Sequence, residues 1–287
     1  MTDSPSDEDD VASGRIAIGV DVGGSGIKAA VVDTESGRFR SERLRVPTPK
    51  PATPEAVSAS IGRLIKRLAK STGISGSAPV GIGLPGVAQD GVLLTAANID
   101  PAWVGFPVAE KLGTTLGRRV SIVNDADAAG IAEMRFGGGA GKRGVVIFLT
   151  LGTGVGSGVF VDGVLVPNTE FGQMEIRGRP AERRSASAAR VRRGLSWKAW
   201  ASDLDEHLQR IEDLMWPTLF ILGGGVSKNG DKFIPRLERR TPVVAATLRN
   251  DAGIIGAAIV AAEGLADAST TFDDLPPGIV SGAAPDA

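Results

Sequence analysis

Residues 15–33 read RIAIGVDVGGSGIKAAVVD, in which two apolar runs flank a turn rich in glycine. Apolar side chains recur at every second position over 16–20 and again over 27–31, a period that is typical of β-strands. The glycines between the two runs allow a tight reversal of the chain. This stretch therefore predicts a β-hairpin near the N-terminus.

The same pattern returns about 130 residues later. Residues 144–151 predict a strand, residues 152–158 (GTGVGSG) a second glycine turn, and residues 159–161 another strand. The remaining periodic segments predict strands over 41–47, 80–84, 120–123, 164–166 and 219–222, and helices over 54–70, 107–117, 126–136, 186–216 and 253–264. Because helices and strands follow both copies, we expect an α/β fold of two similar lobes around a cleft.

The ends of the chain differ from its body in composition. Residues 1–14 and 265–287 are polar and acidic and lack a periodic apolar face, so we expect both tails to be disordered. Between them we expect an N-terminal lobe over 15–124, joined by the C-terminal helix 253–264, and a C-terminal lobe over 125–252.

The composition narrows the chemistry that the chain can perform. Cysteine is absent, which excludes disulfides, thiol nucleophiles and cysteine-based zinc sites. Histidine occurs once, at His207, within an apolar helical pattern, and we interpret it as structural. A general base is therefore expected to be a carboxylate.

Nothing in the sequence predicts export or a membrane partner. The first ten residues contain five acids and no base, whereas a secretory signal has a basic start followed by an apolar stretch. No apolar run approaches the roughly 18–20 residues that span a bilayer. We therefore expect a cytoplasmic protein.

Charge is distributed unevenly along the chain. The total is 32 basic and 33 acidic side chains, but nine of the acids lie in residues 1–10 and 264–287, which contain no base. The intervening residues therefore have 24 acids against 32 bases. A basic body favours a polyanionic ligand, although ordinary surface charge explains the excess equally well.

The first glycine turn contains the groups needed to bind phosphate. Glycines let backbone N–H groups approach an anion closely, a serine hydroxyl adds a donor, and a lysine adds positive charge. The predicted donor-binding residues here are Asp21, Gly23, Gly24, Ser25, Gly26 and Lys28. Asp21 also fits Mg²⁺ bound through water. A plain hairpin turn would account for the glycines alone.

The second glycine turn has related chemistry. Its predicted donor-binding residues are Thr150, Gly152, Thr153 and Gly154, and Gly224 and Gly225 follow the later strand at 219–222. A dinucleotide fingerprint is excluded because that motif leads into a helix, whereas a strand follows this turn. For Gly224 and Gly225, a tight turn between strand and helix is a sufficient explanation.

Two such hairpins in duplicated lobes are typical of the actin-like ATPase (ribonuclease H-like) fold. The chain resembles the ROK family (repressor, open reading frame, kinase), and within it the polyphosphate glucokinase branch of actinobacteria. The matching segments are Asp21–Lys28, Gly81–Gly86, Asn124–Ala129, Leu149–Gly158, Pro167–Glu170, Leu195–Trp197, Leu222–Ser227 and Asn250–Gly253. The resemblance implies transfer of a phosphoryl group to the 6-hydroxyl of glucose from inorganic polyphosphate, with ATP as another donor, Mg²⁺ as cofactor and a homodimer as the assembly.

The pair Asn124-Asp125 follows a predicted strand, where it would ordinarily be interpreted as the N-cap of the next helix. The resemblance instead implies that Asp125 is the general base for the sugar hydroxyl and that Asn124 binds sugar. It adds Gly86, at the end of the strand over 80–84, to the expected glucose site.

The resemblance also implies sugar-binding carboxylates at Glu170 and Glu182. Gln173 stands where the family has a histidine, which leaves the choice of hexose open. Many relatives carry a cysteine-rich zinc loop in this region, and this chain has none of its ligands, so we expect no zinc.

Seven arginines lie within residues 177–193, together with a single acid, Glu182. Forked guanidinium groups suit phosphate, so a polyphosphate track is one interpretation, and a solvated helix face or subunit interface is the other. The predicted track residues are Arg177, Arg179, Arg183 and Arg184. No aromatic residues interleave with them, which argues against nucleic acid as a partner.

Three other functions are compatible with parts of the sequence. The nearest is a hexokinase of the same family that uses only ATP. A sugar-responsive repressor would carry a helix-turn-helix domain before the first glycine turn, and only 20 residues precede Asp21. A sugar-binding protein without activity is suggested only by Gln173.

Overall fold

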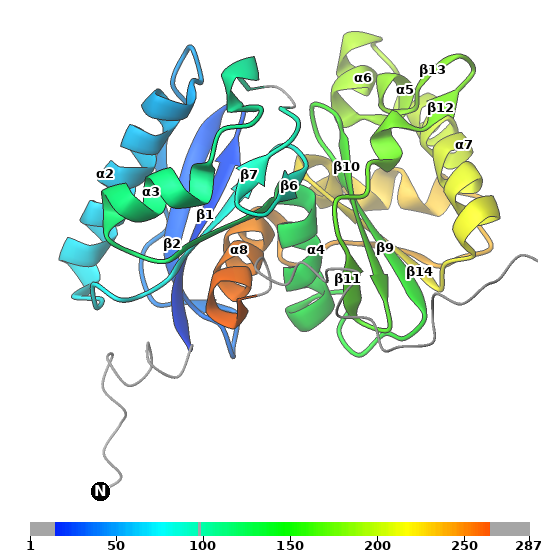
Figure 1. Ribbon diagram of the computed structural model, residues 1–287. Coiled ribbons are helices and arrows are strands. Elements are labelled where there is room, and N and C mark those ends of the chain that lie inside the picture. Colours follow the sequence, from blue (N-terminus) through cyan, green and yellow to red (C-terminus); the bar gives the residue numbers. More distant parts are fainter. Residues whose placement is uncertain (1–14, 97–98, 265–287) are drawn as a thin grey trace, which may run out of the picture.

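The computed structural model describes residues 15–96 and 99–264, which form two β-sheets with helices between and around them (Figure 1). The expectation of disordered tails concerns residues outside the described ones. The described helices include none long and apolar enough to cross a membrane.

The first sheet is built on the hairpin predicted from residues 15–33. Its strands are β1 (Ile16–Gly23), β2 (Gly26–Asp33), β3 (Arg38–Phe39), β4 (Leu44–Val46), β5 (Val80–Leu84) and β8 (Val120–Asn124). The order is β3-β2-β1-β5-β8, with β4 also paired to β2. β1 runs antiparallel to β2 and parallel to β5, and β5 runs parallel to β8.

The second sheet repeats this topology. Its strands are β9 (Val145–Leu151), β10 (Val155–Val161), β11 (Val164–Val166), β14 (Leu219–Gly223) and β15 (Val243–Ala245), in the order β11-β10-β9-β14-β15. β9 is antiparallel to β10 and parallel to β14, as β1 is to β2 and β5. The prediction of two similar α/β halves is therefore confirmed.

Two helices pack against each other between the sheets, α4 (Asp125–Phe136) and α8 (Ala252–Glu263) (Figure 1). Glycines allow their unusually close approach. A Cβ on Gly256 would lie 1.6 Å from the carbonyl oxygen of Ala128, and one on Gly81 would lie 1.7 Å from that of Ala257. Helix α8 thus rests directly on the first sheet and holds the start of α4 beside it.

Other helices cover the outer sides of the sheets. On the first sheet, α2 (Pro54–Thr72) packs its apolar face against β2 and β4, beside α3 (Val108–Leu116). On the second, α7 (Trp197–Met215) buries Trp200 and Leu204 against β9 and β14. Helices α5 (Glu182–Ser185) and α6 (Ser187–Arg192) complete this side.

Short elements fill the connections. They are the hairpins β6 (Ala88–Gln89) with β7 (Val92–Leu93) and β12 (Glu175–Ile176) with β13 (Arg179–Pro180), and the 3₁₀ turns η1 (Pro101–Trp103), η2 (Phe171–Gln173), η3 (Gly225–Lys232), η4 (Ile234–Arg236) and η5 (Arg249–Asp251). None of these was predicted. All but η3 have two or three residues, which give no readable period, and η3 is a glycine-rich 3₁₀ segment without an apolar face.

Three predicted elements have different bounds in the structure. The strand expected over 41–47 is shorter, since β4 spans only Leu44–Val46 and β3 precedes it. The second glycine turn ends earlier, because β10 already begins at Val155. The helix expected over 186–216 is divided into α6 and α7. Gly194, with φ of 61°, ends the helical conformation after α6, and the Ser196 hydroxyl caps the start of α7.

Candidate active site

The first glycine turn connects β1 to β2 and exposes Gly24 and Ser25. Asp21 and Lys28 face each other across the hairpin, with Lys28 Nζ 2.7 Å from Asp21 Oδ2. The register of the two strands pairs these residues directly. One carboxylate and one cation are therefore fixed beside a turn whose backbone is open to a ligand.

A second cation at this turn was not predicted from the sequence. Arg45, on β4, donates from its guanidinium to the carbonyl oxygen of Ser25 at 3.1 Å and covers Gly26, where a Cβ would lie 2.8 Å from Arg45 Nε. Arg45 reaches this turn because β4 pairs with β2, which sets Arg45 opposite Lys28. This pairing cannot be read from the sequence around Arg45 alone.

The second glycine turn connects β9 to β10. The pairing of β9 with β14 sets Gly223 opposite Thr150 and brings Gly224 against Leu151. Gly224 has φ of 82°, and a Cβ there would lie 2.7 Å from the Leu151 carbonyl oxygen, so this position favours glycine. The structure therefore brings together the two glycine segments that the sequence singled out in this half.

Glu182, the first residue of helix α5, contacts the second glycine turn. Its Oε2 accepts a hydrogen bond from the backbone N–H of Val155 at 3.1 Å. A Cβ on Gly154 would lie 2.4 Å from the same oxygen. The predicted sugar carboxylate thus lies in contact with the predicted donor turn.

Asn124 both caps α4 and links it to the first sheet. Its Oδ1 accepts from the backbone N–H groups of Ala126 and Asp127 at 2.8 and 3.1 Å. Its Nδ2 donates to the carbonyl oxygen of Gly86 at 3.0 Å. The capping interpretation is therefore correct, and one Nδ2 hydrogen remains to serve a sugar.

Asp125 lies at the first turn of α4, between groups from both halves. A Cβ on Gly83 of β5 would lie 3.6 Å from its Cα. Burial, together with the negative charges of Asp21 and Glu170, raises the pKa of Asp125 to about 7. A carboxyl group with this pKa is suited to accept a proton near neutral pH.

Asp127 is a second buried acid on α4 that sequence reasoning missed. Burial raises its pKa to about 7, and so do the charges of Asp125 and Glu170, whereas the backbone N–H of Asn168 lowers it. That N–H donates to Asp127 Oδ2 at 2.8 Å. The Asn168 side chain in turn bonds both backbone groups of Ala88, at 2.9 and 3.0 Å, and so joins the two halves.

The predicted sugar loop follows Asn168. Partial burial, and next the negative charge of Glu182, raise the pKa of the Glu170 carboxyl. Gln173 closes η2 and its side chain is exposed. The charge of Glu170 thus acts on Asp125, and that of Glu182 acts on Glu170.

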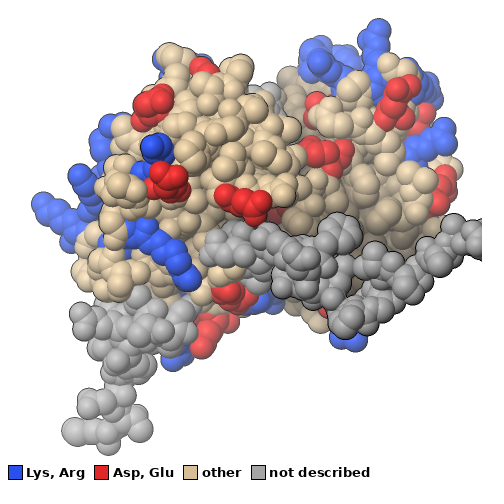
Figure 2. Space-filling view, viewed as in Figure 1, with Lys and Arg blue, Asp and Glu red and all other residues tan. Residues whose placement is uncertain are grey.

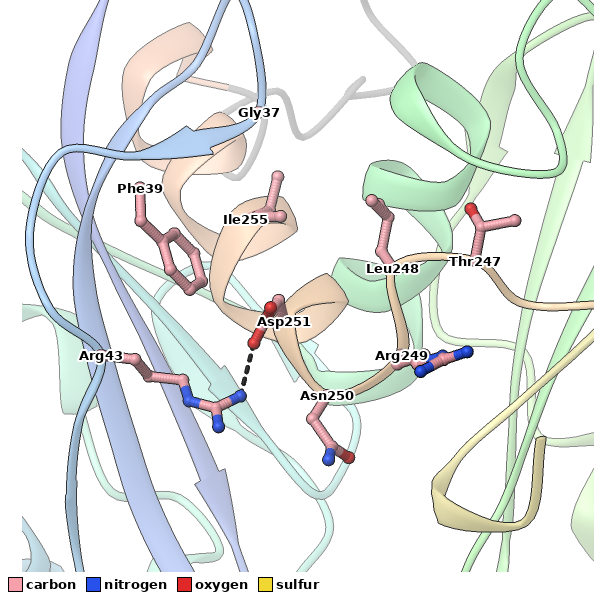
Figure 3. A pocket seen from close by; sticks show the side chains of 9 residues that line it. All are labelled: Gly37, Phe39, Arg43, Thr247, Leu248, Arg249, Asn250, Asp251 and Ile255. Carbon is pink, nitrogen blue, oxygen red and sulfur yellow. Dashed lines mark hydrogen bonds and ion pairs between the residues drawn. The ribbon is translucent and has the colours of Figure 1, made fainter. Parts of the chain in front are cut away.

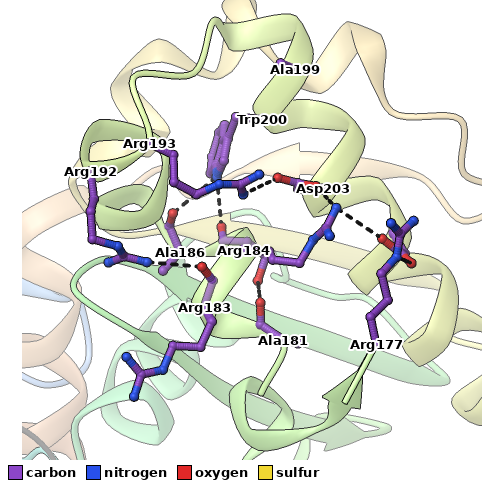
Figure 4. A network of polar contacts seen from close by, with 12 residues as sticks. Arg177, Ala181, Arg183, Arg184, Ala186, Arg192, Arg193, Ala199, Trp200 and Asp203 are labelled. Carbon is purple, nitrogen blue, oxygen red and sulfur yellow. Dashed lines mark hydrogen bonds and ion pairs between the residues drawn. The ribbon is translucent and has the colours of Figure 1, made fainter. Parts of the chain in front are cut away.

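The arginine run is largely an internal network (Figure 4). Arg184 and Arg193 both bind the carboxylate of Asp203, and Arg177 Nε lies 2.8 Å from Glu206. Within the described chain, Arg179 and Arg183 form no ion pair, and both are exposed. Two of the four predicted track residues, Arg177 and Arg184, therefore have acidic partners on α7.

The predicted magnesium site has a single carboxylate, Asp21. The described residues contain no group of three or more His, Asp or Glu side chains that could hold an ion alone. Mg²⁺ commonly binds through one or two carboxylates, several waters and substrate phosphates. Asp21, half-buried beside the open first turn, fits that mode.

The ROK family model matches residues 17–174, more than half of the chain. The chain belongs to the ROK family. The matched range of this ROK protein contains both glycine turns, Asp125 and Glu170, while Glu182 and the arginine run lie beyond it.

Relatives of this ROK protein include sugar kinases. It is 46% identical over 246 residues to a protein named polyphosphate glucokinase from Mycobacterium tuberculosis, covering 85% of this chain and 91% of that protein. The structure of an inorganic polyphosphate/ATP-glucomannokinase from Arthrobacter sp. strain KM matches with a TM-score of 0.84 and 47% identity over 87% of this chain and 99% of that one. A ROK family glucokinase from Streptomyces griseus, solved with glucose and AMPPNP, matches with a TM-score of 0.76 and 28% identity over 87% and 100%. The fold is accordingly the actin-like ATPase fold that was predicted.

Two cavities lie beside this ROK site rather than in it. One, of about 500 Å³, lies between residues 37–43 and 247–255, where Arg43 pairs with Asp251 (Figure 3). The other, of about 1100 Å³, is lined by residues of both halves, including Asn124, Asp127 and Asn168. Asp125, Glu170 and Glu182 line neither cavity. Figure 2 shows the surface hollowed between the two halves at the upper edge of the view.

Proposed function

We propose that this chain phosphorylates glucose at its 6-hydroxyl, with inorganic polyphosphate as phosphoryl donor and ATP as a second donor. The observation that carries the proposal is the raised pKa of the Asp125 carboxyl, about 7. Burial raises it, as do the negative charges of Asp21 in one half and Glu170 in the other. The similarity to polyphosphate-dependent glucose and mannose kinases supports the choice of donor and acceptor.

In the proposed reaction, glucose binds to Asn124, Glu170, Gln173 and Glu182 beside the Gly86 loop. Asp125 accepts the proton of the 6-hydroxyl as the sugar oxygen forms its bond to the terminal phosphorus. The bond from that phosphorus to the bridging oxygen breaks, and the shortened polyphosphate, or ADP, keeps the electron pair. Glucose 6-phosphate is released and Asp125 returns its proton to solvent.

The donor would lie between the two glycine turns. Lys28, Arg45 and the exposed backbone N–H groups of Gly24 and Ser25 stabilise charge on the transferred group from one side. The second turn at Gly152–Gly154, with Gly224 beside it, acts from the other. Mg²⁺, held by Asp21 through water, would neutralise further phosphate charge when bound.

Arg179 and Arg183 are the proposed extension of this site for a polyphosphate chain. They lie in the same segment as Glu182, which contacts the second glycine turn, and their guanidinium groups are exposed. In Figure 4, Arg183 points away from the Asp203 cluster that binds its neighbours. Arginine on such a surface suits a ligand with repeated phosphates.

A donor-by-acceptor assay on the purified protein tests the proposal. Glucose 6-phosphate formation is measured with polyphosphate and with ATP, each with and without Mg²⁺, for wild type and Asp125→Asn. We expect turnover with both donors that is lost in the variant. Turnover with ATP alone would favour the ATP-only hexokinase. Absence of turnover with either donor, together with glucose binding, would favour a sugar-binding protein.

A further inference from the structure

The single histidine of the chain lies at the junction of the two carboxylate-bearing segments. His207, on α7, is fully buried. Its Nε2 lies 3.0 Å from the carbonyl oxygen of Phe171, and its Nδ1 lies 2.9 Å from Oγ of Ser185. The side chain therefore contacts two segments that are 14 residues apart in the sequence.

The partners determine which nitrogen carries hydrogen. A carbonyl oxygen can only accept, so Nε2 is the donor to Phe171. Burial lowers the pKa of His207, which favours the neutral ring. Nδ1 of that tautomer is an acceptor for the Ser185 hydroxyl, whose single hydrogen has a second acceptor in the Ala181 carbonyl oxygen at 3.0 Å. Both ring nitrogens are thus used in holding other parts of the chain.

Each contact lies next to a residue of the proposed sugar site. Phe171 directly follows Glu170, and it begins η2, which ends at Gln173. Ser185 ends α5, the one-turn helix that begins with Glu182. A 3₁₀ turn of three residues and a helix of four have little stability of their own, so their positions depend on such tertiary contacts.

We infer that His207 is a positioning residue for glucose, because its two hydrogen bonds set the spacing between the segments that carry Glu170 and Glu182. The inference rests on the proposed function. Its main consequence concerns the acceptor. Loss of either bond loosens the carboxylates that orient the sugar and, through Glu182, also reaches the second glycine turn, while the first glycine turn, on the other sheet, is unaffected.

Three substitutions distinguish this role from simple filling of the core. His207→Ala removes both bonds. His207→Gln places an amide near the position of Nε2 and can still donate to Phe171, whereas His207→Asn reaches only toward Nδ1. We expect His207→Ala to raise the KM for glucose about tenfold, with His207→Gln and His207→Asn between it and wild type. The KM for polyphosphate should rise less than that for glucose, because the first glycine turn lies on the other sheet and keeps its contacts.

Two further variants serve as controls. Ser185→Ala removes the hydroxyl at Nδ1 with little change of volume, and it should raise the KM for glucose even if His207→Ala does not fold. Glu212→Gln disturbs another buried hydrogen bond of α7, from the Thr241 N–H at 2.6 Å, and should lower thermal stability without changing that KM.

The outcomes separate the inference from the proposed function. If wild type forms no glucose 6-phosphate, the proposed function fails. If wild type is active, and Ser185→Ala and every soluble His207 variant keep its KM for glucose while losing only thermal stability or active fraction, His207 is structural and the inference is overturned.

Discussion

The side-chain amide of Asn124 joins the start of α4 to the loop after β5 by donating to the carbonyl oxygen of Gly86 at 3.0 Å. The same side chain caps α4 through its oxygen. One residue therefore fixes the orientation of the helix turn that carries Asp125 and also contacts the loop predicted to border glucose.

These two roles of Asn124 can be separated by a pair of substitutions. Asn124→Asp keeps the capping oxygen but loses the donor to Gly86, whereas Asn124→Ala loses both. We expect both variants to raise the KM for glucose, and only Asn124→Ala to lose a further ~1 kcal/mol of unfolding free energy. Steady-state kinetics and chemical denaturation measure the two effects. Equal stability of both variants would contradict the capping role.

The pKa of Asp125 sets a pH dependence for catalysis. The carboxylate must be unprotonated to accept the sugar proton, and its pKa is raised to about 7. We expect kcat/KM to rise with pH, with a midpoint near 7, and to level off above it. The midpoint should be the same with polyphosphate and with ATP, because it belongs to the enzyme.

Glu170→Gln provides the control for that assignment. Because the charge of Glu170 contributes to the raised pKa of Asp125, its removal should move the midpoint to lower pH. Asp125→Asn should lower kcat by roughly 10²–10⁴-fold and remove the pH dependence of the residual rate. A midpoint that differs between donors, or stays fixed in Glu170→Gln, would count against Asp125.

The raised pKa of Asp127 predicts that the stability of the fold depends on pH. The pKa of the Asp127 carboxyl is raised from its ordinary value of 3.8 to about 7 in the folded protein. The folded state therefore binds this proton more tightly than the unfolded state. The resulting stabilisation of the fold is complete below pH 4 and is lost as pH rises through 7. Asp127→Asn keeps an oxygen for the Asn168 N–H and carries no charge. It should gain stability over wild type between pH 5 and pH 8, on the order of 3 kcal/mol.

Thermal unfolding of both proteins at pH 5, 6, 7 and 8 measures this gain. Asp213→Asn, on the exposed side of α7, is the matched control and should show no difference that grows with pH. A constant difference between Asp127→Asn and wild type would mean that Asp127 is ionised throughout this range.

The contact between Gly154 and Glu182 predicts a difference between two glycines of one turn. A Cβ at position 154 would lie 2.4 Å from Glu182 Oε2, whereas a Cβ at position 152 meets nothing within 4 Å. Gly154→Ala should displace Glu182 and raise the KM for glucose as well as that for the donor. Gly152→Ala should affect the donor alone. Similar glucose KM values in the two variants would show that Glu182 does not contact sugar.

The sequence predicted the parts of this site that lie at the ends of long strands. Both hairpins, and Asn124-Asp125 at the start of a helix, follow from local period and turn chemistry. The pairing of Asp21 with Lys28 was found only in the structure. Arg45, Asn168 and Asp127 could not be found in that way, because each acts through a contact with a segment distant in sequence. The homodimer, the cytoplasmic location and the absence of zinc stay predictions.

The arginine run shows the same limit, since its composition predicts a phosphate track but not which side chains are already paired. Arg184 and Arg177 bind acids of α7, so removing either should destabilise the fold as well as change the surface. Arg179 and Arg183 form no ion pair within the described residues. The polyphosphate role is therefore best tested on these two.

We expect the double variant Arg179→Ala with Arg183→Ala to raise the KM for polyphosphate about tenfold, because two charge-assisted contacts to successive phosphates are lost. The KM for ATP and for glucose should change little. Arg67→Ala, an exposed arginine of α2 on the other sheet, removes charge of the same kind and should leave the KM for polyphosphate unchanged. Added salt should weaken polyphosphate binding more in wild type than in the double variant. Equal polyphosphate KM values in wild type and double variant would show that the chain of phosphates follows another path.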